Sequence, residues 1–127
     1  MTAEQRALFD KATLTLRTGR ANLELDDPGA AANRAYYAAY YAATAALLGV
    51  GERPKSHAGT HRRFHHLFVT VGLLDAATGG LLVHAYSVRQ RADYDLLAVT
   101  DARATADLLD DVERFIAAVR EAVEAAR

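Results

Sequence analysis

Residues 31–48 read AANRAYYAAYYAATAALL, and this stretch decides the fold. Alanine is the best helix former, and neither proline nor glycine interrupts the run. Tyr36 and Tyr40 are one helical turn apart, as are Tyr37 and Tyr41, so the four rings form two adjacent ridges. Alanine lets a neighbouring helix approach closely, and the rings fill the remaining space. We expect a helix in the core of a bundle, with a tyrosine edge available for an interface or, alternatively, for stacking on bases.

Helix signals continue on both sides of this stretch. Asp27 followed by Pro28 is a helix start, which places this helix at 28 to about 48. The other helices are expected at 3 to about 18, at 55 or 56 to 71, from about 75 onward, and from 100 or 101 onward. Because the connections are a few residues long, the expected fold class is all-α: an antiparallel up-and-down bundle of four to five helices. The whole chain, 1–127, is expected to form a single domain.

Glycines and apolar residues refine this outline. Gly19 is expected to end the first helix, and Gly72 to follow the end of the third. Gly79 and Gly80 either weaken the start of the fourth helix or allow a close helix contact. The apolar stripe of the first helix comprises Ala7, Leu8, Ala12, Leu14 and Leu16. That of the last helix comprises Leu108, Val112, Phe115, Ile116, Val119 and Val123.

The composition narrows the class of protein. With 127 residues, of which 51% are hydrophobic, the chain can bury a stable core without the help of disulfides or metal ions. It has no cysteine, which excludes disulfides, thiolate metal sites and a cysteine nucleophile. A net charge of −1 gives no overall field that attracts nucleic acid, so any such contact is local. There is no long apolar run for a membrane span, and the N-terminal stretch is charged, unlike a signal peptide, so we expect a cytoplasmic protein.

Histidines are concentrated in the predicted third helix. His57, His61 and His65 are spaced i, i+4, i+8 and therefore share one face, with His66 beside them. Such spacing can hold zinc, but no HExxH pattern and no cysteine accompany it, so we expect neither a metal nor a cofactor. His57 lies near the helix N-terminus, where the macrodipole disfavours a protonated imidazole. A neutral His57 is a candidate proton acceptor.

Residues 87–96, SVRQRADYDL, gather two guanidiniums, a carboxylate and a phenol within two turns. Arg89 and Asp93 are spaced i, i+4 and are expected to form an ion pair. Arg34 lies between the two tyrosine ridges, and we expect it to pair with Asp93 inside the bundle. Taken alone, the stretch is equally typical of a solvated helix end.

The order NRAYYAAYYAATAALL, KSHAGTHRRF and VRQRADY resembles the HEPN-domain family of small bacterial and archaeal helical proteins, over about residues 5 to 120. The resemblance is to the stand-alone HEPN proteins, many of which accompany a minimal nucleotidyltransferase as toxin–antitoxin-like pairs. It implies an antiparallel bundle that forms a homodimer. It also implies a nucleotidyltransferase as protein partner, and RNA or a nucleotide as a possible ligand, with no membrane partner.

Many members of the family are metal-independent ribonucleases whose signature is Arg, four to six residues, then His, in a cleft between two protomers. In this chemistry a base removes the proton of the ribose 2′-hydroxyl and a guanidinium stabilises the charge on phosphorus. This sequence departs from the signature, because no histidine follows any arginine at that spacing. Tyr94 stands where the histidine could fall after Arg89, and a tyrosine is a weak base near neutral pH. His57 or His84 are the candidates to replace it from elsewhere in space.

Two functions remain open from the sequence, beside a third possibility, which is a structural or dimerisation bundle without a chemical role. The first is a non-catalytic or weakly catalytic module that binds RNA or a nucleotide and pairs with a nucleotidyltransferase, with Tyr94 as the tyrosine that such a partner modifies. The second is a metal-independent endoribonuclease toxin. The candidate catalytic residues are Arg89, Tyr94 and His57. The candidate binding residues are Arg34, Arg91, Asp93 and Tyr37.

Overall fold

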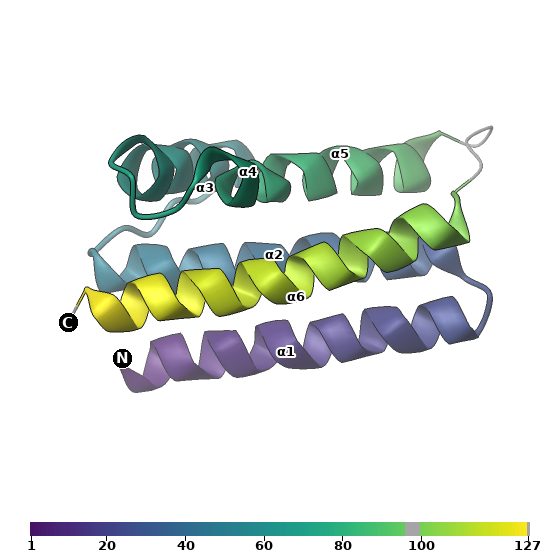
Figure 1. Cartoon of the computed structure of the whole chain (residues 1–127), viewed down its shortest axis with the longest axis horizontal. Helices are drawn as coiled ribbons and strands as arrows, with labels where there is room; N and C mark the ends of the chain where they lie inside the picture. The colour runs from purple at the N-terminus through teal and green to yellow at the C-terminus, as the bar shows by residue number, and fades with distance from the viewer. Residues whose placement is uncertain (96–99, 127) are drawn as a thin grey trace.

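The structure, a computed structural model, describes residues 1–95 and 100–126, and these residues form helices and no strand. Four long helices alternate in direction, as Figure 1 shows. These are α1 (Ala3–Glu24), α2 (Pro28–Gly49), α5 (Leu81–Tyr94) and α6 (Ala102–Ala125). Between α2 and α5 lie α3 (His57–Phe64), the π-helical segment η1 (His65–Thr70) and the short α4 (Ala76–Gly79). The predicted all-α antiparallel bundle is therefore confirmed.

Helix α2 is the helix around which the others are arranged. Asp27 is its N-cap, accepting a hydrogen bond from the Ala30 amide at 3.1 Å, and Pro28 is its first residue, as predicted. Helix α2 packs against α1, α6, α5 and α3. In Figure 1, α1 lies at one edge of the molecule and α3 to α5 lie at the opposite edge. One face of α2 is therefore turned toward α1 and α6, and another toward α3 and α5.

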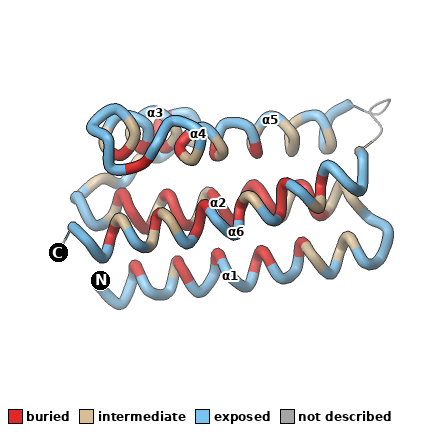
Figure 2. The backbone as a smooth tube through the Cα atoms, in the orientation of Figure 1, coloured by how far each residue is buried: buried red, intermediate tan, exposed pale blue. Residues whose placement is uncertain are grey.

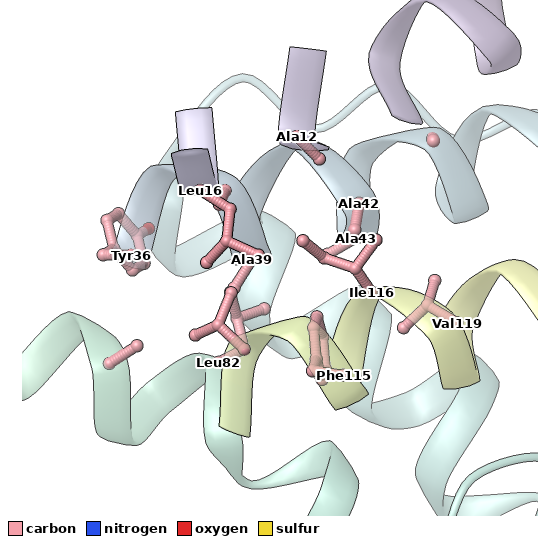
Figure 3. Close-up of a cluster of buried hydrophobic side chains, with 14 of the residues drawn as sticks. Ala12, Leu16, Tyr36, Ala39, Ala42, Ala43, Leu82, Phe115, Ile116 and Val119 are labelled. Carbon is pink, nitrogen blue, oxygen red and sulfur yellow. The ribbon is translucent and has the colours of Figure 1, made fainter. Parts of the chain in front are cut away.

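The core is built on alanines. Apart from Ala30, those of α2 are buried, most of them in one cluster with large side chains of α1 and α6. Figure 2 shows the buried stretch of α2 along most of its length. Figure 3 shows Ala39, Ala42 and Ala43 between Leu16 of α1 and Ile116 of α6. Because alanine has no side chain beyond Cβ, the helix backbones approach closely and the larger residues come from the partner helices.

Helix α1 differs from its prediction in two respects. It does not end at Gly19 but continues to Glu24, because Gly19 lies on a buried face where a Cβ would be 2.9 Å from Leu109 Cδ2. Gly19 is therefore explained by the close packing of α1 against α6, and it does not end the helix. The predicted stripe is also partly wrong, since Leu14 is 57% exposed while Phe9 is fully buried. The stripe predicted for α6 is confirmed, because all six of its residues are buried.

The connection between α2 and α5 is more irregular than predicted. Ser56 caps α3 through the Gly59 amide, and the expected third helix changes from α to π geometry at His65. Gly72 follows η1 with φ +85°, as expected for a glycine that ends a helix. The fourth helix is interrupted after Gly79, where a Cβ would overlap Val69 Cγ2. Both predictions for this glycine pair therefore agree with the structure, since the helix breaks here and Gly79 makes a close helix contact.

Candidate functional site

A chain of polar contacts joins the start of α2 to the end of α5. Asp93 Oδ2 accepts a hydrogen bond from Arg89 Nε at 2.9 Å and another from Asn33 Nδ2 at 3.3 Å. Asn33 Oδ1 in turn accepts from Arg34 Nε at 3.1 Å and from Arg34 Nη2 at 2.8 Å. The predicted Arg89–Asp93 ion pair is confirmed. The predicted Arg34–Asp93 pair is wrong, because Asn33 lies between them and Arg89, one turn before Asp93 on α5, takes the carboxylate.

Two guanidiniums lie close to the ring of Tyr37. Arg34 Cζ is 5.3 Å from its centroid and Arg89 Cζ is 5.2 Å from it, both within cation–π range. We call Arg34 and Arg89 the guanidinium pair. The Arg89 side chain is only 14% exposed, and its contact with Asp93 uses Nε. Among the described residues, its two terminal amino groups therefore have no hydrogen-bond partner and can bind an anion.

Tyr36 joins two histidines of α3. Its hydroxyl lies 2.5 Å from His57 Nδ1 and 2.9 Å from His61 Nε2. The two histidines reach the same atom because they are one turn apart on α3, and Tyr36 is fully buried beneath them. We call Tyr36, His57 and His61 the His–Tyr–His triad.

Further aromatic rings enclose this triad. The Tyr40 ring lies 4.6 Å from that of His57, and the Tyr86 ring lies 5.0 Å from that of His61 and 5.2 Å from that of Tyr36. Tyr86 belongs to α5, one turn before Arg89, whose guanidinium is 5.9 Å from the Tyr36 ring. The triad and the guanidinium pair are therefore parts of one site, formed by α2, α3 and α5.

Burial sets the protonation of the triad. It raises the pKa of the Tyr36 phenol well above its usual range, with a further contribution from the neighbouring phenols, so that this hydroxyl keeps its proton. Burial, followed by the positive charge of Arg89, lowers the pKa of His57. Burial and the neighbouring His57 lower the pKa of His61. The neutral His57 was predicted from the helix dipole, whereas burial and Arg89 are the causes in the structure.

Arg89 itself is held in its charged form. Burial opposes its charge, but the nearby Tyr37 phenol and the Asp93 carboxylate outweigh that effect and raise the pKa of the guanidinium. The site therefore presents fixed positive charge beside two neutral imidazoles, an arrangement suited to an anion and to proton transfer.

The other candidate residues lie outside this cluster. Tyr94 is the last residue of α5 and is 70% exposed. Arg91 and His84, both exposed, line a separate cavity of about 290 Å³ between α5 and α6. His65 and His66 are exposed at the start of η1.

Sequence reasoning missed three members of the site. Tyr36 was interpreted as a packing, interface or base-stacking ring, with no partner named for its hydroxyl. Asn33 was given no role, and His61 was considered only as a possible metal ligand. The i, i+4 spacing of His57 and His61 was the available signal. It could not indicate the partner, because Tyr36 belongs to another helix.

Two further features concern metals and membranes. In the described part of the chain, no three His, Asp or Glu side chains are grouped so as to hold a metal ion. None of the helices within residues 1–95 and 100–126 has the length and apolar character needed to cross a bilayer.

Comparison with known proteins identifies the family. The HEPN domain model matches residues 5–122. A protein of Methanocaldococcus jannaschii named "Putative toxin MJ0605" is 32% identical over 91 residues, which is 72% of this chain and 67% of the relative. A "UPF0332 protein" of Thermotoga maritima is 28% identical over 119 residues, 94% of this chain and 85% of the relative. A "UPF0332 protein" of Gloeobacter violaceus is 33% identical over 94 residues, 74% and 75% of the two chains. With a match over nearly its whole length to the HEPN model, the chain belongs to the HEPN domain family.

Proposed function

We propose that this HEPN protein is a toxin-like endoribonuclease that binds RNA through the guanidinium pair and cleaves it without a metal ion. One observation carries the proposal: Arg89 lies in the same cluster as His57 and His61. No arginine of this sequence is followed by a histidine at the spacing typical of the family, and these two histidines of α3 supply the imidazole instead. The names of two relatives, each called a putative toxin, agree with a toxin-like role.

The guanidinium pair is suited to a phosphodiester. Arg89 is fixed by Asp93 through Nε, and Arg34 is fixed by Asn33 through Nε and Nη2. The remaining N–H groups are pre-oriented, so little side-chain entropy is lost when they bind phosphate oxygens.

The cleavage reaction needs only proton transfer and charge stabilisation. One imidazole removes the proton of the ribose 2′-hydroxyl, and the 2′ oxygen then bonds to the adjacent phosphorus. The bond from phosphorus to the 5′ oxygen breaks, the 5′ oxygen takes a proton, and a 2′,3′-cyclic phosphate remains. Arg89 stabilises the negative charge that develops on the phosphoryl oxygens.

The experiment is cleavage of a panel of fluorescent RNAs in the presence of EDTA. Wild type is expected to cut at least one of them, and Arg89→Ala is expected to lose about 100-fold or more in rate, as for removal of one transition-state donor. Arg17→Ala is the matched control, because Arg17 is exposed on α1 at the opposite edge of the bundle. No cutting by wild type across the panel, or equal rates for the two variants, rejects the proposal.

A second function is favoured by one observation, the 70% exposure of Tyr94 at the end of α5. An exposed phenol close to the site can be modified by a nucleotidyltransferase partner, as the family resemblance implies. Co-expression with a nucleotidyltransferase encoded beside this chain is then expected to add a nucleotide to the protein, detected by mass spectrometry. Tyr94→Phe should remove the added mass, and an unmodified wild-type protein would count against this function.

We also propose that the active form is a homodimer in which two copies of the 89–94 stretch meet. Light scattering at micromolar concentration is expected to give twice the chain mass. A monomer under these conditions contradicts the proposal.

A further inference from the structure

The hydroxyl of Tyr36 has one proton but lies between two nitrogen atoms. It is 2.5 Å from His57 Nδ1 and 2.9 Å from His61 Nε2. It can donate to only one of these nitrogens, and must accept a hydrogen bond from the other, which therefore carries a proton. Because each neutral imidazole has a single N–H, the choice made at Tyr36 fixes which nitrogen of each ring is protonated.

Only two arrangements satisfy both hydrogen bonds. If Tyr36 donates to His57 Nδ1, both rings carry their proton on Nε2. If Tyr36 donates to His61 Nε2, both rings carry it on Nδ1. The two histidines therefore always have the same tautomer, although one contacts Tyr36 through Nδ1 and the other through Nε2.

The two distances favour one of the arrangements. Hydrogen bonds donated by a hydroxyl are shorter than those donated by an N–H, with usual values near 2.7 and 2.9 Å respectively. The 2.5 Å contact with His57 fits donation by the Tyr36 hydroxyl, and the 2.9 Å contact fits donation by His61 Nε2–H. His57 then presents an N–H at its outer nitrogen, Nε2, and His61 presents a lone pair at Nδ1.

Both outer nitrogens reach solvent. Every buried side-chain nitrogen and oxygen among the described residues has a hydrogen-bond partner. The outer nitrogens of these two half-buried rings have none there, so they are accessible to water or to a ligand.

We propose that Tyr36 locks His57 and His61 as a complementary pair, in which His57 is the proton donor and His61 the proton acceptor toward a bound phosphodiester. This inference rests on the proposed function and deepens it, since it assigns roles within the same site. It also reverses the role expected for His57 from the sequence, which was that of a proton acceptor.

The proton balance closes within the triad. During cleavage, His61 Nδ1 takes the proton of the 2′-hydroxyl, and His57 Nε2–H gives its proton to the departing 5′ oxygen. The Nε2 proton of His61 then moves to the Tyr36 oxygen, while the Tyr36 proton moves to His57 Nδ1. Both imidazoles end neutral, each with its proton on Nδ1, and no proton is gained from or lost to solvent.

The surrounding charges agree with this assignment. Arg89 acts electrostatically on His57, and it disfavours a second proton on that ring. A His57 that begins neutral and gives up a proton avoids an imidazolium beside a guanidinium. The relay through Tyr36 also keeps His61 from retaining the proton that it receives.

The test is the tautomeric state, measured by long-range proton–nitrogen NMR on histidine labelled with nitrogen-15, at pH 7.5. In wild type, both His57 and His61 are expected to show a protonated Nε2 and an unprotonated Nδ1. Tyr36→Phe removes the shared hydroxyl, so His57 Nδ1 should shift toward the value of an unbonded nitrogen. Tyr40→Phe is the matched control, because the Tyr40 hydroxyl lies 3.4 Å from Thr60 Oγ1 and hydrogen-bonds to neither histidine.

The outcomes separate this inference from the proposed function. Different tautomers on the two histidines, a protonated Nδ1 on both, or unchanged spectra in Tyr36→Phe would each overturn it, whether or not RNA is cut. If wild type cuts RNA, Tyr36→Phe should be about 100-fold slower than Tyr40→Phe with similar RNA affinity, a loss typical of general acid–base catalysis. Equal rates for the two variants overturn the relay. Matched tautomers without any RNA cleavage leave the coupling intact and reject only the ribonuclease.

Discussion

The two faces of α2 have opposite characters. Toward α1 and α6 it presents alanines, whose fully buried methyl groups need no hydrogen-bond partner. Toward α3 and α5 it presents Tyr36, Tyr37 and Asn33, each of which makes polar or cation–π contacts with a neighbouring side chain. The residues of α2 that pack the core and those that form the candidate site therefore lie on different faces of the same helix, although they are only a few positions apart in the sequence.

Because the two faces differ, we expect mutations on them to have different consequences. Changes on the alanine face and its partners should lower the free energy of unfolding and affect RNA only through unfolding. Changes to the ion-paired residues beside the tyrosine face, such as Arg89, should affect RNA binding or cleavage with little loss of stability, because their ion pairs are partly exposed and contribute little. Phe115→Ala and Arg89→Lys test that separation, whereas Gly79→Ala tests the packing of η1 against α4 and the pH dependence tests the protonation of the triad.

The largest expected effect is on stability, from Phe115→Ala. Phe115 of α6 is 1% exposed and packs against Phe64 with ring centroids 5.7 Å apart. Truncation should lower the free energy of unfolding by about 3–5 kcal/mol, measured by urea denaturation. At temperatures where the variant remains folded, its RNA affinity should equal that of wild type. A specific loss of RNA affinity in folded Phe115→Ala would break the separation.

Next in size is the effect of Arg89→Lys on RNA. A lysine keeps the positive charge but cannot bond Asp93 and a phosphate with one planar fork. We expect an RNA cleavage rate about 100-fold lower, with a change in unfolding free energy below about 1 kcal/mol. A rate close to that of wild type would mean that charge alone suffices, and that the fork held by Asp93 is irrelevant.

A smaller stability effect is expected for Gly79→Ala, at the junction of α4 and α5. The added Cβ would overlap Val69 Cγ2, so η1 must move away from α4. Overpacking of this kind costs about 1–3 kcal/mol, measurable by urea denaturation. Because Ala has the higher helix propensity, an unchanged or raised stability would show that η1 yields freely.

The smallest effect is the pH dependence that the triad contributes. The folded-state pKa of both His57 and His61 lies below the unfolded value of 6.5, mainly because the rings are buried. The positive charge of Arg89 lowers the pKa of His57 further, and the neighbouring His57 does the same for His61. Below pH 6.5 the unfolded chain binds more protons, so stability falls as the pH drops toward the folded pKa values. The urea midpoint should therefore be lower at pH 5.5 than at 7.5. His61→Gln should reduce this difference, and an equal difference in the variant would contradict the assignment.

Much of the fold could be predicted because its signals are local. The Asp27–Pro28 start, the Gly72 stop and the apolar spacing of α6 each depend on residues close together in the sequence. Gly19 was misjudged because its role depends on Leu109 of α6, which local sequence cannot place beside it. The exposure of Leu14 similarly depends on where α2 and α6 lie around α1.

The site was predictable only in part, for the same physical reason. The Arg89–Asp93 ion pair follows from i, i+4 spacing on one helix, and it was predicted. The contacts Tyr36–His57 and Asn33–Asp93 link different helices and need the packing of α2 against α3 and α5. Arg34 was assigned to Asp93 because the alternative partner, its own neighbour Asn33, offers no charge and so no obvious signal.

The central claim is that an anion binds to the guanidiniums of Arg34 and Arg89, beside His57. The most direct measurement is NMR titration with a short DNA oligonucleotide, which has the phosphodiester but no 2′-hydroxyl and so is not cleaved. The account predicts saturable shifts of the Arg34 and Arg89 side-chain Nε–H signals and of the His57 ring, with none at Arg17. Shifts spread over other arginines, or no shift at Arg89, would contradict it.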